Sequence, residues 1–333
     1  MKNLFFTREL VLKFAGYRKG MVIYMKKIGT IIICAVIISS LLVVGKLTLT
    51  PMLMRDANYG MSRLKNLQQV EKLFIGSSMF RQGIDLESLG TDTYLLSYNG
   101  NQPYAEYLEV EHLLQNDVEI GTLYVDMYAY SMTAEVALSD TRVFQDVPPS
   151  FTLSLYQELR ESGGADMGDL FEMIVTSNNE VFFTWPVSFP LINSRYQNGG
   201  NLGRSGGSTA EILDALPADF SGTTDLNEVQ CDYMVKLINL CRDNGVDIVF
   251  VETPKYAALY EKSTYAEIMK KYLEFLGKNQ CVAMISGQTA EACAVMESES
   301  CIVYSFDNQN PAMFMDLIHM SYDGRVAFSE FLK

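Results

Sequence analysis

Three residues in two short motifs have the types needed for nucleophilic catalysis. Ser78 follows an apolar run that ends at Gly76, and Asp316 stands three residues before His319. A serine hydroxyl is a poor nucleophile at neutral pH, and it becomes a useful one when an imidazole accepts its proton and a carboxylate orients that imidazole. We therefore predict that Ser78 is a nucleophile, that His319 is its base and that Asp316 orients the base.

His112 is the alternative base, because the sequence contains only two histidines. It lies between acidic neighbours in a segment with helical spacing, away from the end of any predicted strand. Catalytic residues concentrate on loops that a rigid scaffold positions. We therefore predict that His112 lies on a solvated helix surface.

Short apolar runs that stop at turn residues predict buried strands at residues 73–75, 93–96, 122–125, 246–251 and 302–304. Helical spacing predicts helices at residues 103–115 and 226–244, and a third from Ser263 or Thr264 to about Leu276. Strands that alternate with helices predict an α/β fold, a mainly parallel sheet flanked by helices in three layers. Such a sheet carries its site on loops at the carboxyl ends of the strands, and Ser78 follows the first strand.

An uncharged stretch near the N-terminus predicts one transmembrane helix. Residues 28–45 carry no charge, and about 18 to 20 such residues span a bilayer core. Seven basic side chains and one acid precede this stretch, which by the positive-inside rule keeps the N-terminus in the cytoplasm. We predict a cytoplasmic basic tail at residues 1–27, an anchor at 28–49 and an extracytoplasmic domain at 55–333, so that the protein is a single-pass protein of the cell membrane.

Two alternatives at the N-terminus stay open. A cleaved signal peptide would carry small residues in an A-x-A-like pattern after its apolar core, and residues 43–49 read Val-Val-Gly-Lys-Leu-Thr-Leu, which favours an uncleaved anchor. Met25 and the two lysines after it also resemble the start of an anchor sequence. Residues 1–24 are therefore either a long cytoplasmic tail or an extension from a wrongly assigned start.

The charge of the chain argues against nucleic acid as a partner. The first 27 residues have a net charge of +6, which leaves −20 for the rest of a chain whose net charge is −14. Lysine and arginine supply most of the affinity for phosphate backbones. We interpret the acidic balance as a solvated exterior.

The cysteines do not predict a metal site. Five cysteines lie beyond the anchor without a C-x-x-C motif, and two histidines supply zinc poorly. Cys231 and Cys241 fall on one predicted helix, about 15 Å apart, which is too far for a disulfide. Pairing among Cys281, Cys293 and Cys301 and buried free thiols both remain open. We expect no cofactor and no metal.

Residues 148–221 break the alternation of strands and helices and predict an insertion that caps the site. The insertion contains an aromatic cluster at residues 182–185 and a glycine-rich stretch at residues 198–207. The glycine spacing does not indicate a dinucleotide loop, because this stretch neither follows a predicted strand nor opens a helix. We interpret it as a surface loop.

The two motifs resemble conserved blocks of the SGNH, or GDSL-like, hydrolase superfamily. Residues 74–78, Phe-Ile-Gly-Ser-Ser, are similar to its first block, whose last residue is the nucleophile, and residues 316–319 to its terminal Asp-x-x-His block. Residues 95–100 resemble its second block, in which Gly100 matches the second glycine and Ser97 replaces the first. The resemblance implies an oxyanion hole that includes the backbone amides of Ser97 and Ser78.

The third block departs from the superfamily pattern. The resemblance implies an asparagine side chain in the oxyanion hole, whereas residues 125–130 read Val-Asp-Met-Tyr-Ala-Tyr. Removing such a donor costs on the order of a hundredfold in rate, so the chain either recruits Tyr128 or another donor or is a slow or specialised catalyst. Asp126 either binds a hydroxyl or caps the next turn. Lys255, after the strand at residues 246–251, either holds an anionic acceptor or is a solvated loop lysine.

The anchor, the Gly-Ser-Ser form and the altered third block make the chain look most like the membrane-anchored branch related to the D-alanyl-lipoteichoic acid transfer protein. That resemblance implies a serine esterase or O-acyltransferase that acts on acyl groups of a cell-envelope polymer through an acyl-Ser78 intermediate, beside a membrane-bound O-acyltransferase. The rival reading, favoured by the missing asparagine, is a catalytically silent ectodomain that binds glycan or scaffolds such an acyltransferase.

Overall fold

The computed structural model describes residues 24–41, 44, 64, 67–136, 205–216, 222–297 and 299–333, with scattered positions between 153 and 170. The chain divides into two compact units, Met1–Leu49 and Thr50–Lys333. In the first unit, the helix Tyr24–Leu41 is long and apolar enough to cross a membrane. It begins four residues before the predicted anchor and includes Lys26 and Lys27, whereas the predicted end of the anchor at residues 45–49 lies outside the described residues.

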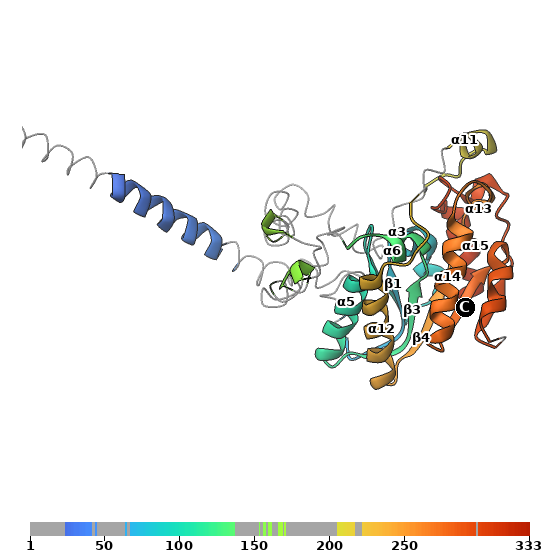
Figure 1. The fold of residues 1–333 in the computed structure, drawn as a ribbon, viewed down its shortest axis with the longest axis horizontal. Coiled ribbons are helices and arrows are strands. Elements are labelled where there is room, and N and C mark those ends of the chain that lie inside the picture. The colour runs from blue at the N-terminus through green and yellow to red at the C-terminus, as the bar shows by residue number, and fades with distance from the viewer. Residues whose placement is uncertain are drawn as a thin grey trace, which may run out of the picture. The chain divides into compact units, whose positions relative to one another are not determined.

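The second unit is an α/β domain built on a parallel sheet (Figure 1), as the sequence predicts. Its six strands follow the order β2-β1-β3-β4-β5-β6, and every neighbouring pair is parallel. The strands are β1 (Gln69–Gly76), β2 (Thr93–Ser97), β3 (Glu119–Asp126), β4 (Asp247–Val251), β5 (Val282–Ser286) and β6 (Cys301–Tyr304). The chain passes outward from β1 to β2 and then returns past β1 to β3, so the direction of winding reverses between β1 and β3.

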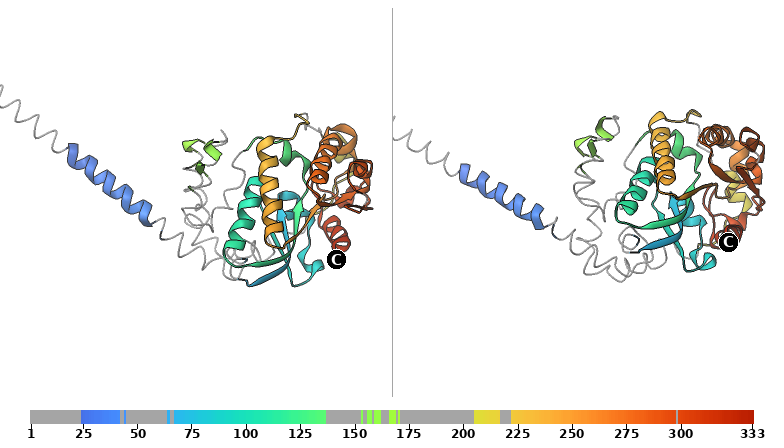
Figure 2. Two further views of the ribbon diagram at one scale, coloured as in Figure 1. Left: turned by 60° about the horizontal axis from the view of Figure 1, so that its bottom comes forward. Right: turned by 90° about the horizontal axis from the view of Figure 1, so that it is seen from below.

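Helices cover both faces of the sheet (Figures 1 and 2). The crossovers after β2, β3 and β4 contain α5 (Pro103–Gln115), α12 (Glu228–Asp243) and α14 (Tyr265–Lys278). All three crossovers run in the same direction along the sheet, so right-handed connections place these helices on one face. On the other face α15 (Tyr322–Ser329) contacts α3 (Ser78–Gly83) and α4 (Leu86–Leu89).

Aromatic side chains fill the core on both sides of the sheet. Phe74 of β1 stacks on Tyr124 of β3 and contacts Phe80 of α3 edge to face. On the opposite face Phe250 of β4 meets Tyr272 of α14. Burying a Phe side chain stabilises a fold by about 1.5–3 kcal/mol relative to leaving it exposed, and Phe74, Phe80 and Phe250 are fully buried. This packing fixes β1 and α3, the strand that leads to Ser78 and the helix that Ser78 begins.

Local signals explain the ends of the long helices. Pro103 opens α5 at a position where its missing N–H costs nothing. The side chain of Asn227 caps α12 through the amides of Val229 and Gln230, and Gly245 follows its end with a φ of 69°, a conformation that favours glycine. The predicted bounds of these helices are therefore close to the observed ones.

The sequence interpretation missed one strand and the short helices. Strand β5 reads Val-Ala-Met-Ile-Ser, and alanine and methionine do not distinguish a strand from a helix in so short a run. The other missed elements pack through tertiary contacts rather than through a long periodic pattern: α3, α4, α15, α6 (Ala129–Thr133), α11 (Ala210–Ala215), α13 (Ala257–Lys262) and the 3₁₀ helices η3 (Gly287–Val295), η4 (Pro311–Met313) and η5 (Glu330–Leu332).

Most of the predicted insertion at residues 148–221, with its aromatic cluster and residues 198–204, lies outside the described residues. Its described C-terminal part contacts the loop that leads to Asp316. The amide of Ser208 donates to the carbonyl of Phe314, and the carbonyl of Ser205 accepts from the amide of Tyr322. This part of the insertion is therefore attached beside the segment that contains Asp316 and His319.

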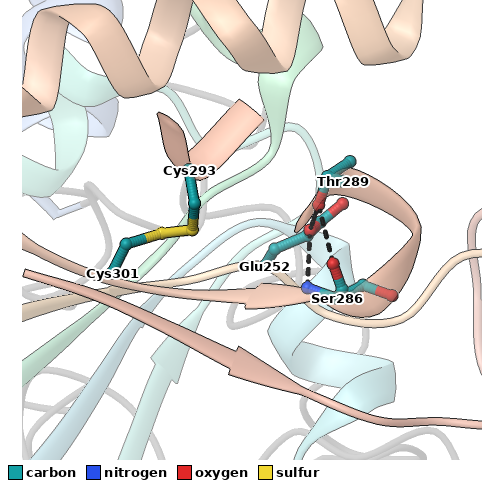
Figure 3. The surroundings of a disulfide bond; sticks show 5 residues. All are labelled: Glu252, Ser286, Thr289, Cys293 and Cys301. Carbon is teal, nitrogen blue, oxygen red and sulfur yellow. Dashed lines mark hydrogen bonds between the residues drawn. A yellow bond between two sulfur atoms is a disulfide. The ribbon is translucent and has the colours of Figure 1, made fainter. Parts of the chain in front are cut away.

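A disulfide joins Cys293 of η3 to Cys301 of β6, so one of the two open possibilities for the last three cysteines is realised (Figure 3). Cys281 remains a buried thiol, and Cys231 and Cys241 on α12 are free, as their spacing predicts. The disulfide lies beside the turn where Ser286 and Thr289 bind the Glu252 carboxylate (Figure 3).

Candidate active site

Ser78 lies at the carboxyl end of the sheet, where the winding reverses. Strand β1 ends at Gly76, and Ser78 is the first residue of α3. The side chain of Ser77 caps this helix by accepting from the amide of Met79. Open parallel sheets bind ligands in the crevice at such a reversal point. The strand-to-helix turn therefore presents Ser78 where a parallel α/β domain has its usual site.

Asp316 and His319 are joined by hydrogen bonds within a single turn of the chain. One carboxylate oxygen of Asp316, Oδ1, accepts from the amides of Ile318 and His319, each at 2.8 Å. The other oxygen, Oδ2, lies 2.7 Å from Nδ1 of His319. The spacing of three residues thus lets one carboxylate fix both the turn and the imidazole ring.

The fold brings the nucleophile and the base together. His319 Nε2 lies 3.0 Å from Ser78 Oγ, and the side chains of His319 and Asp316 are 18% and 40% exposed. In the tautomer that carries its proton on Nδ1, the imidazole donates to Asp316 and accepts from the Ser78 hydroxyl. The three predicted residues therefore form a hydrogen-bonded relay that substrate can reach from solvent.

Asp316 is held in its charged form. Burial alone would raise its pKa, but the hydrogen bond and charge of His319 and the two backbone amides outweigh burial and lower the pKa below the usual value. An ionised carboxylate is the form that stabilises an imidazolium during proton transfer.

Asp126 anchors the nucleophile turn from the neighbouring strand. Its Oδ2 atom, at the end of β3, accepts from the amide of Ser77 at 3.2 Å and from the Ser77 hydroxyl at 2.5 Å. Gly76 permits this approach, because a Cβ at that position would overlap Cβ of Asp126. Burial raises the pKa of Asp126, opposed by Lys255 and by the bonds from Ser77. Of the two predicted roles, hydroxyl binding is the one observed, and the hydroxyl belongs to Ser77.

Ser97 does not face the site. It is fully buried at the end of β2, and its hydroxyl donates to the carbonyl of Ser77. This placement argues against its amide as an oxyanion donor, because a fully buried amide cannot reach a substrate. Gly100 is exposed in the turn after β2 with a φ of 65°. The Ser78 amide, as the first of a helix, has no acceptor within that helix.

Tyr128 lies two residues after β3, partly buried against Tyr130. Burial, followed by the proximity of Tyr130 and of Asp126, raises the pKa of its hydroxyl. The hydroxyl therefore keeps its proton at physiological pH and can donate a hydrogen bond, as a replacement for an asparagine donor requires.

Lys255 differs from both sequence interpretations, because it is neither solvated nor open to a ligand. Its side chain is fully buried, and Nζ donates to the carbonyl of Thr253 at 2.9 Å and to the Thr253 hydroxyl. The following segment is bound to the second motif, because the amide of Tyr256 donates to the carbonyl of Leu317. Lys255 therefore lies in the interior of the domain, next to the segment that contains Asp316 and His319.

His112 is buried rather than solvated, which corrects the sequence interpretation. Its backbone carbonyl, in the last turn of α5, accepts from the side chain of Asn116, the residue that follows the helix. This helix starts at the carboxyl end of the sheet and ends just before β3 begins, so His112 lies towards the edge opposite Ser78. The correction leaves His319 as the histidine next to the serine.

Arg81 and Glu252 make polar contacts around the site that the sequence does not predict. Arg81, one turn after Ser78, donates to Oδ1 of Asn99 at 3.1 Å and ties α3 to the loop after β2. Glu252 is fully buried after β4 and accepts from the amide of Ser286 and the hydroxyl of Tyr260. No sequence pattern marks these pairs, because the partners lie on other elements: Asn99 after β2, Tyr260 on α13 and Ser286 at the end of β5.

Among the described residues, no group of three or more histidine, cysteine, aspartate or glutamate side chains is arranged to hold a metal ion. Comparison with models of known protein families gives no match, and no curated protein matches the chain.

A buried acid near the site predicts a pH-dependent stability. Glu106 of α5 is 2% exposed, and burial, followed by the charges of Asp126 and Glu109, raises its pKa well above the usual value. A group whose pKa is higher in the folded state than in the unfolded state destabilises the fold as pH rises through that interval. We expect the free energy of unfolding to fall as pH rises from about 4.3, the ordinary glutamate pKa.

Glu106→Gln should reduce that slope and raise the free energy of unfolding at pH 8 by about 1–3 kcal/mol, the scale of a poorly compensated buried polar group. Urea denaturation at pH 5, 6.5 and 8 measures the effect. Glu119→Gln, at an exposed position on β3, is the matched control and should change little. Equal slopes for Glu106→Gln and wild type would contradict the assignment.

Proposed function

We propose that this chain is a membrane-anchored, extracytoplasmic serine esterase or O-acyltransferase of the SGNH, or GDSL-like, type. The observation that carries the proposal is the hydrogen-bonded relay from Asp316 through His319 to Ser78, with 2.7 Å between Asp316 Oδ2 and His319 Nδ1 and 3.0 Å between His319 Nε2 and Ser78 Oγ. Its position at the reversal point of a parallel sheet adds support.

The geometry supports a two-step acyl transfer. Ser78 Oγ attacks an ester or thioester carbonyl while His319 Nε2 takes the hydroxyl proton and Asp316 stabilises the imidazolium. The tetrahedral intermediate collapses, the leaving alcohol or thiol receives the proton from His319, and an acyl-Ser78 ester remains. A water or a polymer hydroxyl then gives its proton to His319, attacks the acyl ester and releases Ser78.

The oxyanion side of the proposed enzyme uses the amide of Ser78 and the hydroxyl of Tyr128. The Ser78 amide begins α3, and the Tyr128 hydroxyl retains its proton. Gly100 remains a candidate for a further backbone donor. A donor set without the asparagine of the superfamily pattern fits an enzyme that handles one kind of acyl group and reacts slowly with others.

Two observations support a location outside the cytoplasm. The helix Tyr24–Leu41 follows a basic segment, and the domain contains the Cys293–Cys301 disulfide. Disulfides persist in oxidising compartments and are rare in the cytosol. We propose on the basis of the resemblance that the acyl group belongs to a cell-envelope polymer and that a membrane-bound O-acyltransferase is the partner.

A fluorophosphonate probe tests the proposal directly, because it phosphonylates an activated serine. Full-length protein in detergent micelles should be labelled at Ser78, identified by mass spectrometry of the modified peptide. Ser78→Ala should remove the label, and Ser77→Ala tests whether the neighbouring serine is the reactive one. Absence of labelling in folded wild-type protein would favour the rival, a catalytically silent ectodomain that binds glycan or scaffolds an acyltransferase.

A further inference from the structure

Lys255 is a buried cation between the two motifs of the site. Its ammonium group is fully buried and lies 5.8 Å from the centre of the Tyr128 ring. An ammonium group loses strong hydration when it is buried, so a fold retains it where nearby negative charges compensate. Three carboxylates interact with it electrostatically: Asp126 at the end of β3, Glu252 at the end of β4, and Asp316.

The segment that carries Lys255 contacts both halves of the relay. Thr253 packs against Gly83 at the end of α3, the helix that Ser78 begins. On the other side, the amide of Tyr256 donates to the carbonyl of Leu317, next to Asp316. The carbonyl of Lys255 itself accepts from the side chain of Asn308. The backbone around Lys255 is thus fixed between the nucleophile helix and the base loop.

We propose that Lys255 is a positioning residue of this site, whose buried positive charge holds the carboxylates of Asp126 and Asp316 in place and through them the Ser77–Ser78 turn and His319. The role rests on the proposed function. Lys255 does not contact substrate, because its side chain is fully buried.

The role of Lys255 depends on its protonation. Burial lowers the pKa of Lys255 to about 8, against the opposing effect of Asp126, Glu252 and Asp316. Below that pH the cation is present and offsets the burial of Asp126, whose pKa burial raises. Above it Lys255 becomes neutral, and Asp126, Glu252 and Asp316 lose its compensating positive charge. The loss of positioning should therefore develop between about pH 7 and pH 9 in the wild type.

The test compares labelling rates of full-length protein in detergent with a fluorophosphonate probe from pH 6.5 to 9.5. Lys255→Met keeps the length and the apolar stem and removes the charge. We expect its rate constant to be about 10- to 100-fold below that of wild type at pH 7, since small misplacements of reacting groups cost on that order. Lys278→Met, at an exposed position on α14, should label at the wild-type rate.

The pH dependence separates a charge effect from a purely structural one. The ratio of the Lys255→Met rate constant to that of wild type cancels the effects of pH on His319 and on the probe. We expect this ratio to rise towards one above pH 9, because wild type then loses the same charge. A ratio that stays constant with pH, or a Lys255→Met protein that labels like wild type, would overturn the positioning role.

Two further measurements keep the outcomes distinct. Circular dichroism at each pH shows whether every variant is folded. If Lys255→Met does not fold, Lys255→Arg is the deciding variant, because arginine stays charged throughout this pH range. Lys255→Arg should retain labelling above pH 9, where the labelling of wild type declines. An equal decline in both proteins would overturn the proposal. A folded wild type that is not labelled at Ser78 overturns the proposed function and the role of Lys255 with it, whereas unchanged labelling of Lys255→Met overturns only the role of Lys255.

Discussion

His319→Ala should lower the fluorophosphonate labelling rate by about 10⁴-fold or more, because the Ser78 hydroxyl then has no base at 3.0 Å to accept its proton. Removal of one member of such a relay costs nearly as much as removal of the whole, so Asp316→Asn should also produce a severe loss, up to about 10⁴-fold. The measurement is the second-order rate constant of labelling, followed by intact-mass spectrometry.

His112→Ala is the matched control for the base. It removes the other histidine, which lies at the far end of α5. At a temperature where the variant is folded, we expect its labelling rate to be within a few-fold of that of wild type. Because His112 is buried, we also expect the substitution to lower the thermal stability. Loss of labelling in His112→Ala together with its retention in His319→Ala would contradict the assignment of the base.

Gly76→Ala should produce the second large effect. The added methyl group would overlap Cβ of Asp126, so either β1 or β3 must move at the turn that carries the nucleophile. Overpacking a rigid site costs about 1–3 kcal/mol of stability, and displacement of a reacting group by about 1 Å can cost about 100-fold in rate. Thermal unfolding and labelling of the same preparation measure the two effects.

Gly222→Ala is the control for this substitution. An added Cβ at Gly222 meets no atom within 4 Å, so we expect wild-type labelling and a stability change within about 0.5 kcal/mol. Gly76→Ala with wild-type labelling and stability would show that the close approach of Asp126 to the turn is not required.

The parts of this site that the sequence predicts are the local ones. Asp316 and His319 are three residues apart, and all three hydrogen bonds described for the Asp316 carboxylate are made to residues within that span. Ser78 follows a recognisable strand, and parallel strands place their carboxyl ends at one edge of the sheet. The α/β class follows for the same reason, because each long helix and most strands have their own periodic pattern and end signals.

The parts that the sequence does not predict depend on the order of strands. Asp126 can anchor Ser77 only because β3 pairs with β1, an arrangement that no local pattern encodes. Lys255 and Glu252 follow an apolar strand and resemble ordinary loop residues in the sequence, yet both are fully buried by contacts with elements distant in the sequence, such as the Ser286–Thr289 turn that binds Glu252. His112 lies on a helix with a weakly amphipathic pattern, so its buried face could not be assigned from spacing alone.

The distance along the chain between the two motifs has a consequence for biogenesis. Ser78 and His319 are separated by 241 residues along the chain, and strands β2 to β6 all lie between them. If the domain crosses the membrane behind an N-terminal anchor that stays in place, the serine emerges long before the imidazole. In the proposed enzyme the nucleophile therefore stays unreactive throughout translocation, and acyl chemistry begins only when the segment around Asp316 docks against the completed sheet.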